Sequence, residues 1–391
     1  MLKFFYIFSI LVVFIANISF AKIIISPTYV GWLVNVTYIL GITLLIPSIY
    51  KKGKKLEWAY IGTMLLGLLF HSFLPEEEKY PLINAIQWIF PVIIIIASRK
   101  YRPPVLFFYL LLTFFITHSV LAIIEYKLQN NLYDYSYVEG FSLYSDSKDF
   151  RAFGLMEHPL YSANVTLIIM SFIMISKDIN SGLKITLLTL GTLAMLCFNS
   201  RTAMIICGCL LIYRYLLYNI KPIFIIILGV LIYALFLSDI VSFIQQNSTI
   251  FGRLAEKNNL TDDSSLSRLM SYMFFWNAGW NFQDIVLGGR IIYMPGTEYS
   301  LENGILLTIS WWGWIVGVLK VILELVISYL CLKNYNVKDK WMVMIACWGT
   351  AFANNNSINT FVFVFFIVSF LSINSLAYKK NMKKPQRYLQ F

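Results

Sequence analysis

Five arginines are the residues in this chain whose type and placement could do chemistry. Arg151, Arg201, Arg253, Arg268 and Arg290 lie in the segments that separate or flank long apolar runs. A guanidinium group is a planar fork that binds phosphate or carboxylate through two parallel hydrogen bonds, whereas the lysine ammonium is a hydrated point charge. The five arginines therefore predict contact with an anionic ligand. The alternative is that each pairs with a loop carboxylate in an ordinary surface ion pair.

The elements that must position these arginines are membrane-spanning helices. Of 391 residues, 59% are hydrophobic and only 13% are charged, and an apolar run of about 17 to 25 residues can cross a bilayer as a helix. We predict an all-α polytopic membrane protein, a single integral membrane domain over residues 1–391. Its twelve spans are expected near 4–21, 29–49, 57–74, 81–98, 104–124, 159–176, 184–199, 202–219, 221–241, 303–331, 341–354 and 357–378, the eleventh being short and part of a shallow hairpin.

The charged loops orient this path. The basic segments 51–55, 99–102, 333–340 and 379–387 are expected to be cytoplasmic, and both termini then lie inside. Of the 31 Lys and Arg residues, 20 fall inside, 10 outside and one in a span; of the 20 acidic residues, three fall inside, 16 outside and one in a span. The inner cations are 16 lysines and 4 arginines, while the outer ones are five of each. Arginine is thus concentrated on the face where positive charge is normally avoided.

Two outer loops are long enough to predict a function, because loops much beyond about 15 residues are uncommon without one. The first, 125–158, is rich in tyrosine and acid, which suits either sugar binding or a membrane interface. The second, 242–302, contains an amphipathic helix that is expected to begin near Asp262. Arg268 and Tyr272, four residues apart, share one side of that helix. This helix either holds Arg268 over a cavity between the spans or lies in the interface as packing.

Arg201 and two further charged residues lie in or beside the spans. Arg201 occupies the minimal outer turn between the seventh and eighth spans, where it needs an anionic partner or a polar cavity. Lys320 and Glu324 lie one turn apart within the tenth span. This pair is either a proton relay or a structural bridge between helices.

Composition also sets what the chain is not expected to bind. All five cysteines fall in apolar spans and the three histidines are well separated, so we expect neither a disulfide framework nor a metal centre, and no cofactor. The net charge of +11 reflects inner-face lysines that meet anionic lipid, so no nucleic-acid partner is expected. Residues 1–21 have the pattern of a leader peptide, but we favour a retained first span.

Four local patches give the chain a resemblance to a known family. It resembles the bacterial O-antigen polymerase and O-antigen ligase superfamily of polytopic glycosyltransferases, with the polymerase branch favoured, in most of its topology and in the order of these patches around the long loop. The patches are Arg151-Ala152-Phe153-Gly154 followed by His158-Pro159, Asn199-Ser200-Arg201, Ser267-Arg268 with Gly288-Gly289 beyond, and Glu302-Asn303-Gly304 followed by Gly313 and Gly317.

The resemblance implies a GT-C-like fold and metal-independent transfer of a glycan from an undecaprenyl-diphosphate carrier at the periplasmic face of the bacterial inner membrane. Negative charge grows on the diphosphate as its bond to the sugar breaks, and arginines aimed at that charge lower the barrier. We assign Arg201 and Arg268 to the diphosphate. Arg151 and Arg290 are additional candidates, and Tyr272 is a candidate contact to the bound substrate.

The acceptor hydroxyl must lose a proton, so the resemblance also implies a base. In the ligase branch a histidine begins the motif before the tenth span, but here the position holds Glu302, which favours the polymerase branch and makes Glu302 the first candidate. Glu302 could instead only stabilise a helix N-terminus. His158, oriented by Glu157, is the second candidate. The expected function is a polysaccharide repeat-unit polymerase that works with a chain-length regulator protein; the alternatives are a ligase using the same donor and a lipid-linked-sugar flippase.

Overall fold

The computed structural model describes residues 1–75, 82–133, 150–220, 263–290, 292, 301, 303–352 and 360–381. Throughout these ranges the chain forms helices and their connections, without a strand. The prediction of an all-α protein is confirmed. The expected ninth span at 221–241, Arg253 and Glu302 lie outside the described residues.

The helices follow the apolar runs of the sequence. In the first part of the chain these are α1 (Leu2–Ala16), α2 (Ser19–Ile25), α3 (Pro27–Ile49), the 3-10 turn η1 (Tyr50–Lys52), α4 (Lys55–His71), α5 (Leu82–Ser98) and α6 (Leu106–Leu128). After the first long loop come α8 (Pro159–Ile175), α9 (Ser181–Phe198), α10 (Arg201–Ile212) and its π-helical extension η3 (Tyr213–Leu217). The last group is α13 (Asp263–Trp276), α14 (Phe282–Val286), α15 (Gly304–Cys331), α16 (Val337–Trp348), the 3-10 turn η5 (Gly349–Phe352) and α17 (Thr360–Asn381).

Length and composition mark several of these helices as membrane spans. Four of them, over Pro27–Lys52, Leu106–Leu128, Ser181–Phe198 and Gly304–Cys331, are long and apolar enough to cross a bilayer, and α1 with α2 passes the same test as a bent pair. The chain is therefore an α-helical, multi-pass membrane protein. The count of twelve spans and the orientation remain predictions.

The first expected span is wrong in shape, because the helix does not continue to residue 21. α1 ends at Ala16, and α2 leaves it at an angle of 91°. Asn17 donates from Nδ2 to the carbonyl of Val13 at 2.7 Å and so closes the last turn of α1. α1 nevertheless buries Tyr6 and Ile10 completely or nearly so against the bundle.

Two helices form the centre of the bundle. Every residue of α8 from Ser162 to Ile175 is buried, and α17 is buried from Val362 to Ile373. A helix that is apolar on all sides can be covered by other helices or by lipid; α8 packs against α9, α16 and α17, so protein covers it. Large apolar side chains are exposed on the outer helices, for example Trp32 on α3 and Ile185 on α9, where lipid is expected to cover them.

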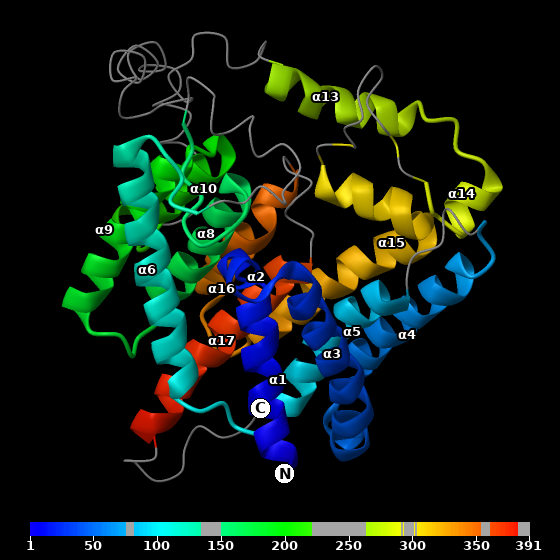
Figure 1. Ribbon diagram of the computed structural model, residues 1–391, viewed down its shortest axis with the longest axis horizontal. Helices are drawn as coiled ribbons and strands as arrows, with labels where there is room; N and C mark the ends of the chain where they lie inside the picture. Colours follow the sequence, from blue (N-terminus) through cyan, green and yellow to red (C-terminus); the bar gives the residue numbers. More distant parts are fainter. Residues whose placement is uncertain are drawn as a thin grey trace.

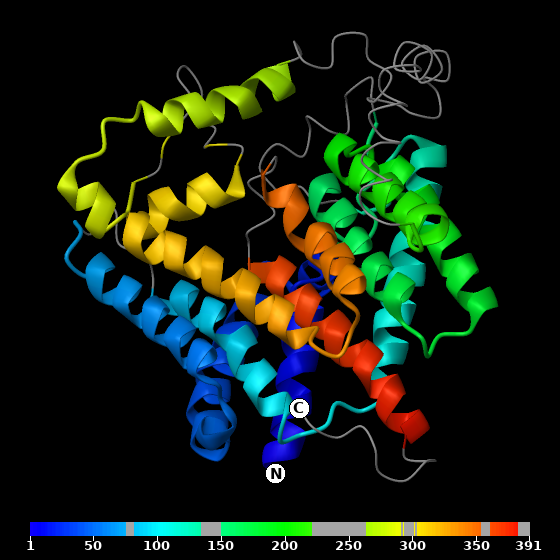
Figure 2. The same cartoon turned by 180° about the vertical axis from the view of Figure 1, so that it is seen from behind.

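The bundle has two distinct ends. α13 lies across one end, and the N-terminus and the end of α17 lie at the other (Figures 1 and 2). In the predicted topology the end covered by α13 faces outwards, and we call it the outer end. The starts of α8 and α10 lie toward this end (Figure 1).

Candidate functional site

The segment 150–156 is buried against the outer end of the bundle. Ala152 and Phe153 have no exposed surface. Ala152 N–H donates to the carbonyl of Cys197 at 3.1 Å, and the Ser162 hydroxyl donates to the carbonyl of Phe153 at 2.6 Å. Buried backbone groups must be satisfied in this way, so this part of the predicted loop 125–158 is fixed by the bundle.

A carboxylate from α6 holds the same segment. Glu125 is fully buried, and its Oε2 accepts from the N–H groups of Phe153 and Gly154, both at 2.7 Å. Its Oε1 accepts from the N–H of Leu132 at 3.2 Å. Hydrogen bonds to a charged acceptor are stronger than neutral ones. Glu125 stands at the first position of the predicted loop 125–158, and the sequence predicted no role for it in the site.

Gly154 is required by the close approach of α6. Its φ is +60°, and a Cβ there would lie 2.7 Å from Nδ1 of His118. That nitrogen accepts from the N–H of Leu155 at 3.0 Å. Only glycine adopts this backbone conformation readily and leaves room for the imidazole. The glycine of the Arg-Ala-Phe-Gly patch thus has a packing reason, and His118 is a second supporting residue that the sequence did not predict.

Arg151 and Arg201 belong to segments that are bonded to each other. The hydrogen bond between Ala152 and Cys197 joins the residue after Arg151 to the last turn of α9. The chain then reverses at Asn199, whose φ is +51°, and Arg201 is the first residue of α10. Both arginines are partly buried. The structure therefore brings the segments that carry two predicted site residues together at the outer end, beside the positive dipole end of α10.

His158 caps the start of α8. Its Nδ1 accepts from the N–H of Leu160 at 3.1 Å. Burial lowers the pKa of His158 to about 4, so the imidazole is neutral near pH 7. Because Nδ1 is the acceptor, the proton of the neutral ring lies on Nε2, and this arrangement favours donation from Nε2 over removal of a proton. Glu157, expected to orient the ring, forms an ion pair with Lys22 at 2.8 Å.

A helix over Asp263–Trp276, α13, lies where the sequence predicted one. The hydroxyl of Tyr272 donates to the carbonyl of Phe352 at 3.0 Å, and Nδ2 of Asn303 donates to the same carbonyl at 2.9 Å. These bonds fix α13 to the start of α15 and to η5. Arg268 lies one helical turn before Tyr272; the side chains of residues 263–269 are outside the described part of the structure.

Arg290 is engaged by its own loop. Its Nη1 donates to Asp284 at 2.6 Å and to the carbonyl of Gly279 at 3.2 Å, and its Nη2 donates to the carbonyl of Ala278 at 2.5 Å. The guanidinium also lies over the Trp280 ring. These contacts connect the end of α13 to α14, which favours a structural role for Arg290 over a contact to ligand.

The glycines of the third and fourth patches meet at a break in α15. Gly313 has φ 77° and ψ 162°, so the helix is interrupted there. The Trp311 carbonyl accepts from Gly289 N–H at 2.8 Å and from His71 Nε2 at 2.9 Å. A Cβ on Gly288 would overlap the backbone of residues 311–313. The glycines are therefore needed for backbone to approach backbone.

The intramembrane pair of α15 joins three helices. Lys320 and Glu324 are completely or almost completely buried, with Nζ 2.8 Å from Oε1. The Tyr60 hydroxyl of α4 donates to the same oxygen at 2.7 Å, and Lys320 Nζ lies 3.4 Å from the centre of the Trp88 ring of α5. A buried pair with additional polar and aromatic partners is well suited to hold helices together, which favours the structural bridge over the proton relay.

Within the described ranges, His, Cys, Asp and Glu side chains form no group of three or more that could hold a metal ion.

No family model, curated protein or solved structure matches this chain. The geometry of its own residues therefore has to support any statement about function.

Proposed function

We propose that this protein is a polysaccharide repeat-unit polymerase of the O-antigen polymerase and ligase superfamily. It transfers a glycan from an undecaprenyl-diphosphate carrier to a lipid-linked acceptor oligosaccharide at the periplasmic face of the bacterial inner membrane, without a metal ion. The observation that carries the proposal is the pairing of the Arg151 and Arg201 segments at one end of the bundle, through Ala152 and Cys197.

The reaction needs the kind of positive charge that these segments supply. The bond between the anomeric carbon of the donor sugar and the diphosphate oxygen breaks, and its electron pair leaves with the diphosphate. A bond forms between that carbon and the acceptor hydroxyl oxygen, and the hydroxyl proton passes to a base. Arg201 and Arg151 stabilise the departing diphosphate through bidentate hydrogen bonds, and the N-terminus of α10 adds to their field.

The remaining roles follow from the same arrangement. Arg268 is carried by α13, which is fastened across the outer end through Tyr272, and completes the set of cations around the diphosphate. Glu302 is the proposed base, one residue before the Asn303 that caps α15. His158 donates from Nε2 to the substrate instead of acting as the base. A chain-length regulator is the proposed protein partner.

Substitution of Arg201 by lysine tests the proposal. In a deletion strain complemented with Arg201→Lys, we expect polymer to fall at least tenfold at wild-type protein level, because a point charge cannot replace the fork. Arg290→Lys is the matched control, because it makes the same change from arginine to lysine at an arginine whose contacts are structural. It should retain most polymer.

The glycan bands of the deletion strain distinguish the reaction. A core that carries one repeat unit indicates a polymerase, whereas bare core with polymer left on the lipid carrier indicates a ligase. Near-normal polymer from Arg201→Lys would remove the diphosphate role of Arg201 and with it the basis of the proposed chemistry.

A further inference from the structure

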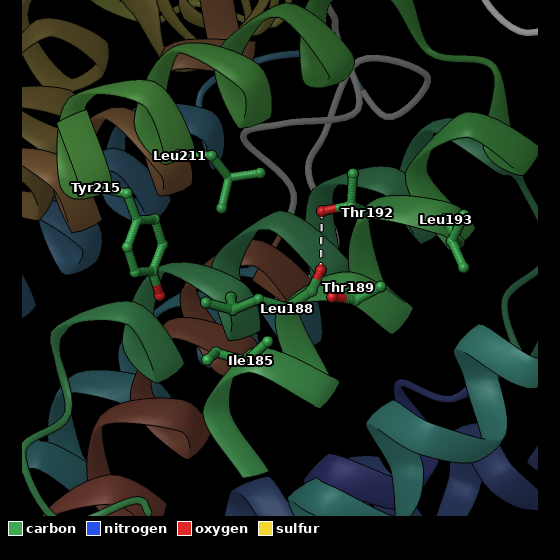
Figure 3. A pocket seen from close by; sticks show the side chains of 7 residues that line it. All are labelled: Ile185, Leu188, Thr189, Thr192, Leu193, Leu211 and Tyr215. Carbon is green, nitrogen blue, oxygen red and sulfur yellow. Dashed lines mark hydrogen bonds between the residues drawn. The ribbon is translucent and has the colours of Figure 1, made fainter. Parts of the chain in front are cut away.

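An open apolar groove lies between α9 and the α10–η3 helix. Its volume is about 430 Å³, and its floor and walls on the α9 side are Ile185, Leu188, Thr189, Thr192 and Leu193, faced by Leu211 and Tyr215 from the other helix (Figure 3). The Thr192 hydroxyl donates to the carbonyl of Leu188 at 2.8 Å, so its polarity is satisfied within α9. The groove therefore offers an apolar surface to its occupant.

The depth of the groove matches the inner leaflet. In the predicted topology α9 begins at the cytoplasmic face and ends at the outer turn that carries Arg201. The α9 residues of the groove, from Ile185 to Leu193, span about 12 Å along the helix. The hydrocarbon layer of one leaflet is about 15 Å thick. The groove thus covers the depth of one acyl chain of the inner leaflet, and the headgroup of such a lipid would lie beside Lys184 and Arg214.

Cations gather at this inner end. Lys184, next to Ile185, donates to the carbonyl of Ser176 at the end of α8. Arg214, next to Tyr215 in the π-helical turn, pairs with Asp339 at 2.9 Å. A third cation, Lys338 of α16, donates to the carbonyl of Tyr218 at 2.5 Å, and the Tyr218 ring lies under both Arg214 and Lys338.

The local charge favours an anion. Of the three cations Lys184, Arg214 and Lys338, only Arg214 forms a direct ion pair with Asp339. The turn before α9 adds one charge of each sign with Lys177 and Asp178. The positive charges of Lys184 and Arg214 repel each other, whereas the carboxylate of Asp339 attracts both cations. A phosphate placed between them would relieve this repulsion. π-helical turns are rare and frequently occur at functional sites, and the turn Tyr213–Leu217 supplies both Arg214 and Tyr215.

We propose that this groove and its cations form a binding site for an anionic glycerophospholipid of the inner leaflet. One acyl chain lies in the groove, and the phosphate contacts Lys184 and Arg214. Basic pockets between transmembrane helices on the cytoplasmic side bind anionic headgroups by the same physics. The site is separate from the proposed transfer reaction, because Arg201 lies at the opposite end of the same two helices.

Lipid retention by the purified full-length protein tests this site. The protein is delipidated in detergent and incubated with phosphatidylglycerol or phosphatidylcholine of identical acyl chains, and bound lipid is counted by native mass spectrometry. We expect phosphatidylglycerol to bind more tightly than phosphatidylcholine. Lys184→Gln should weaken the binding of phosphatidylglycerol about fivefold, which is the effect of removing one cation near a membrane surface. Lys51→Gln, which removes an exposed inner-face lysine elsewhere, should leave it unchanged.

A second variant tests the groove without touching its charges. Thr189→Trp places a large side chain in the open groove and should lower retention of phosphatidylglycerol. This test remains valid even when Lys184→Gln fails to fold. Equal retention of the two lipids by the wild type, or full retention by Thr189→Trp, would overturn the proposal. Displacement of phosphatidylglycerol by undecaprenyl phosphate would also overturn it, by assigning the groove to the substrate carrier.

Discussion

Replacing Glu125 by glutamine tests whether a buried carboxylate holds the Arg151 segment in place. Glutamine keeps the size of the side chain but turns one acceptor oxygen into an NH₂ group. In its best orientation the remaining oxygen faces Phe153 and Gly154. The NH₂ group then faces the N–H of Leu132, and two donors meet without an acceptor.

The magnitude follows from the three bonds that Glu125 accepts. Hydrogen bonds to charged groups contribute about 1.5–3 kcal/mol and neutral ones about 0.5–1.5. Two bonds, to Phe153 and Gly154, therefore weaken by about 1 kcal/mol each, and loss of the longer Leu132 bond adds about 1.5 kcal/mol, the low end of the range for a charged acceptor. Glu125→Gln should lower stability by about 3.5 kcal/mol. Glu157→Gln is the matched control: its ion pair with Lys22 is partly exposed, and such pairs contribute at most about 1 kcal/mol.

Two readouts on the same preparations decide the question. Thermal unfolding in detergent, followed by tryptophan fluorescence, should show a clearly lower midpoint for Glu125→Gln than for Glu157→Gln. Polymer formation in complemented cells, compared at equal protein level in the membrane, should fall for Glu125→Gln alone, because the segment that carries Arg151 is no longer fixed. A wild-type midpoint together with wild-type polymer for Glu125→Gln would refute the reasoning.

Three other predictions concern single positions. Gly154→Ala should lose polymer and stability, measured as above, whereas Gly182→Ala, at an exposed position where a Cβ meets only a side-chain oxygen at 3.6 Å, should not. Burial lowers the pKa of His158 from 6.5 to about 4, so between these pH values the folded protein binds fewer protons than the unfolded chain. Its stability should therefore rise with pH across that window. His158→Asn keeps an acceptor at the cap and should reduce the slope of stability against pH in a denaturation series from pH 4 to 7. An impermeant thiol reagent should label Asn277→Cys from the periplasmic side and spare Lys51→Cys until lysis, and the reverse pattern would invert the topology.

Much of the helical layout could be predicted from apolar runs alone. The run 29–49 corresponds to α3 (Pro27–Ile49), and the run 303–331 corresponds to α15 (Gly304–Cys331). Hydropathy records that a segment avoids water, so it locates helices well. It carries no information on direction, and for that reason the bend after Ala16 and the break at Gly313 were missed.

The site was predictable only where a residue type is itself informative. The predicted topology places Arg151 and Arg201 on the face that normally avoids positive charge, and the structure brings their segments together. Glu125 and His118 gave no comparable signal, because the backbone N–H groups of Phe153, Gly154 and Leu155 that they bind are 28 to 37 residues away along the chain. The contacts of Arg290 could not be predicted either, because they depend on the carbonyl groups of Ala278 and Gly279, whose direction is set by the turn after α13.

The joint between Gly288 and Gly313 also has a genetic consequence. Its contacts are made by main-chain atoms, so no neighbouring side chain can shrink to accept a larger residue there. Selection for restored function in a Gly288 mutant should therefore yield reversion to glycine at that codon and very few suppressors elsewhere. A lesion at a packed side chain, such as Leu74 beside Gly289, leaves several compensating changes open. The spectrum of second-site mutations would thus separate positions where the fold needs a particular backbone from those where it needs only volume.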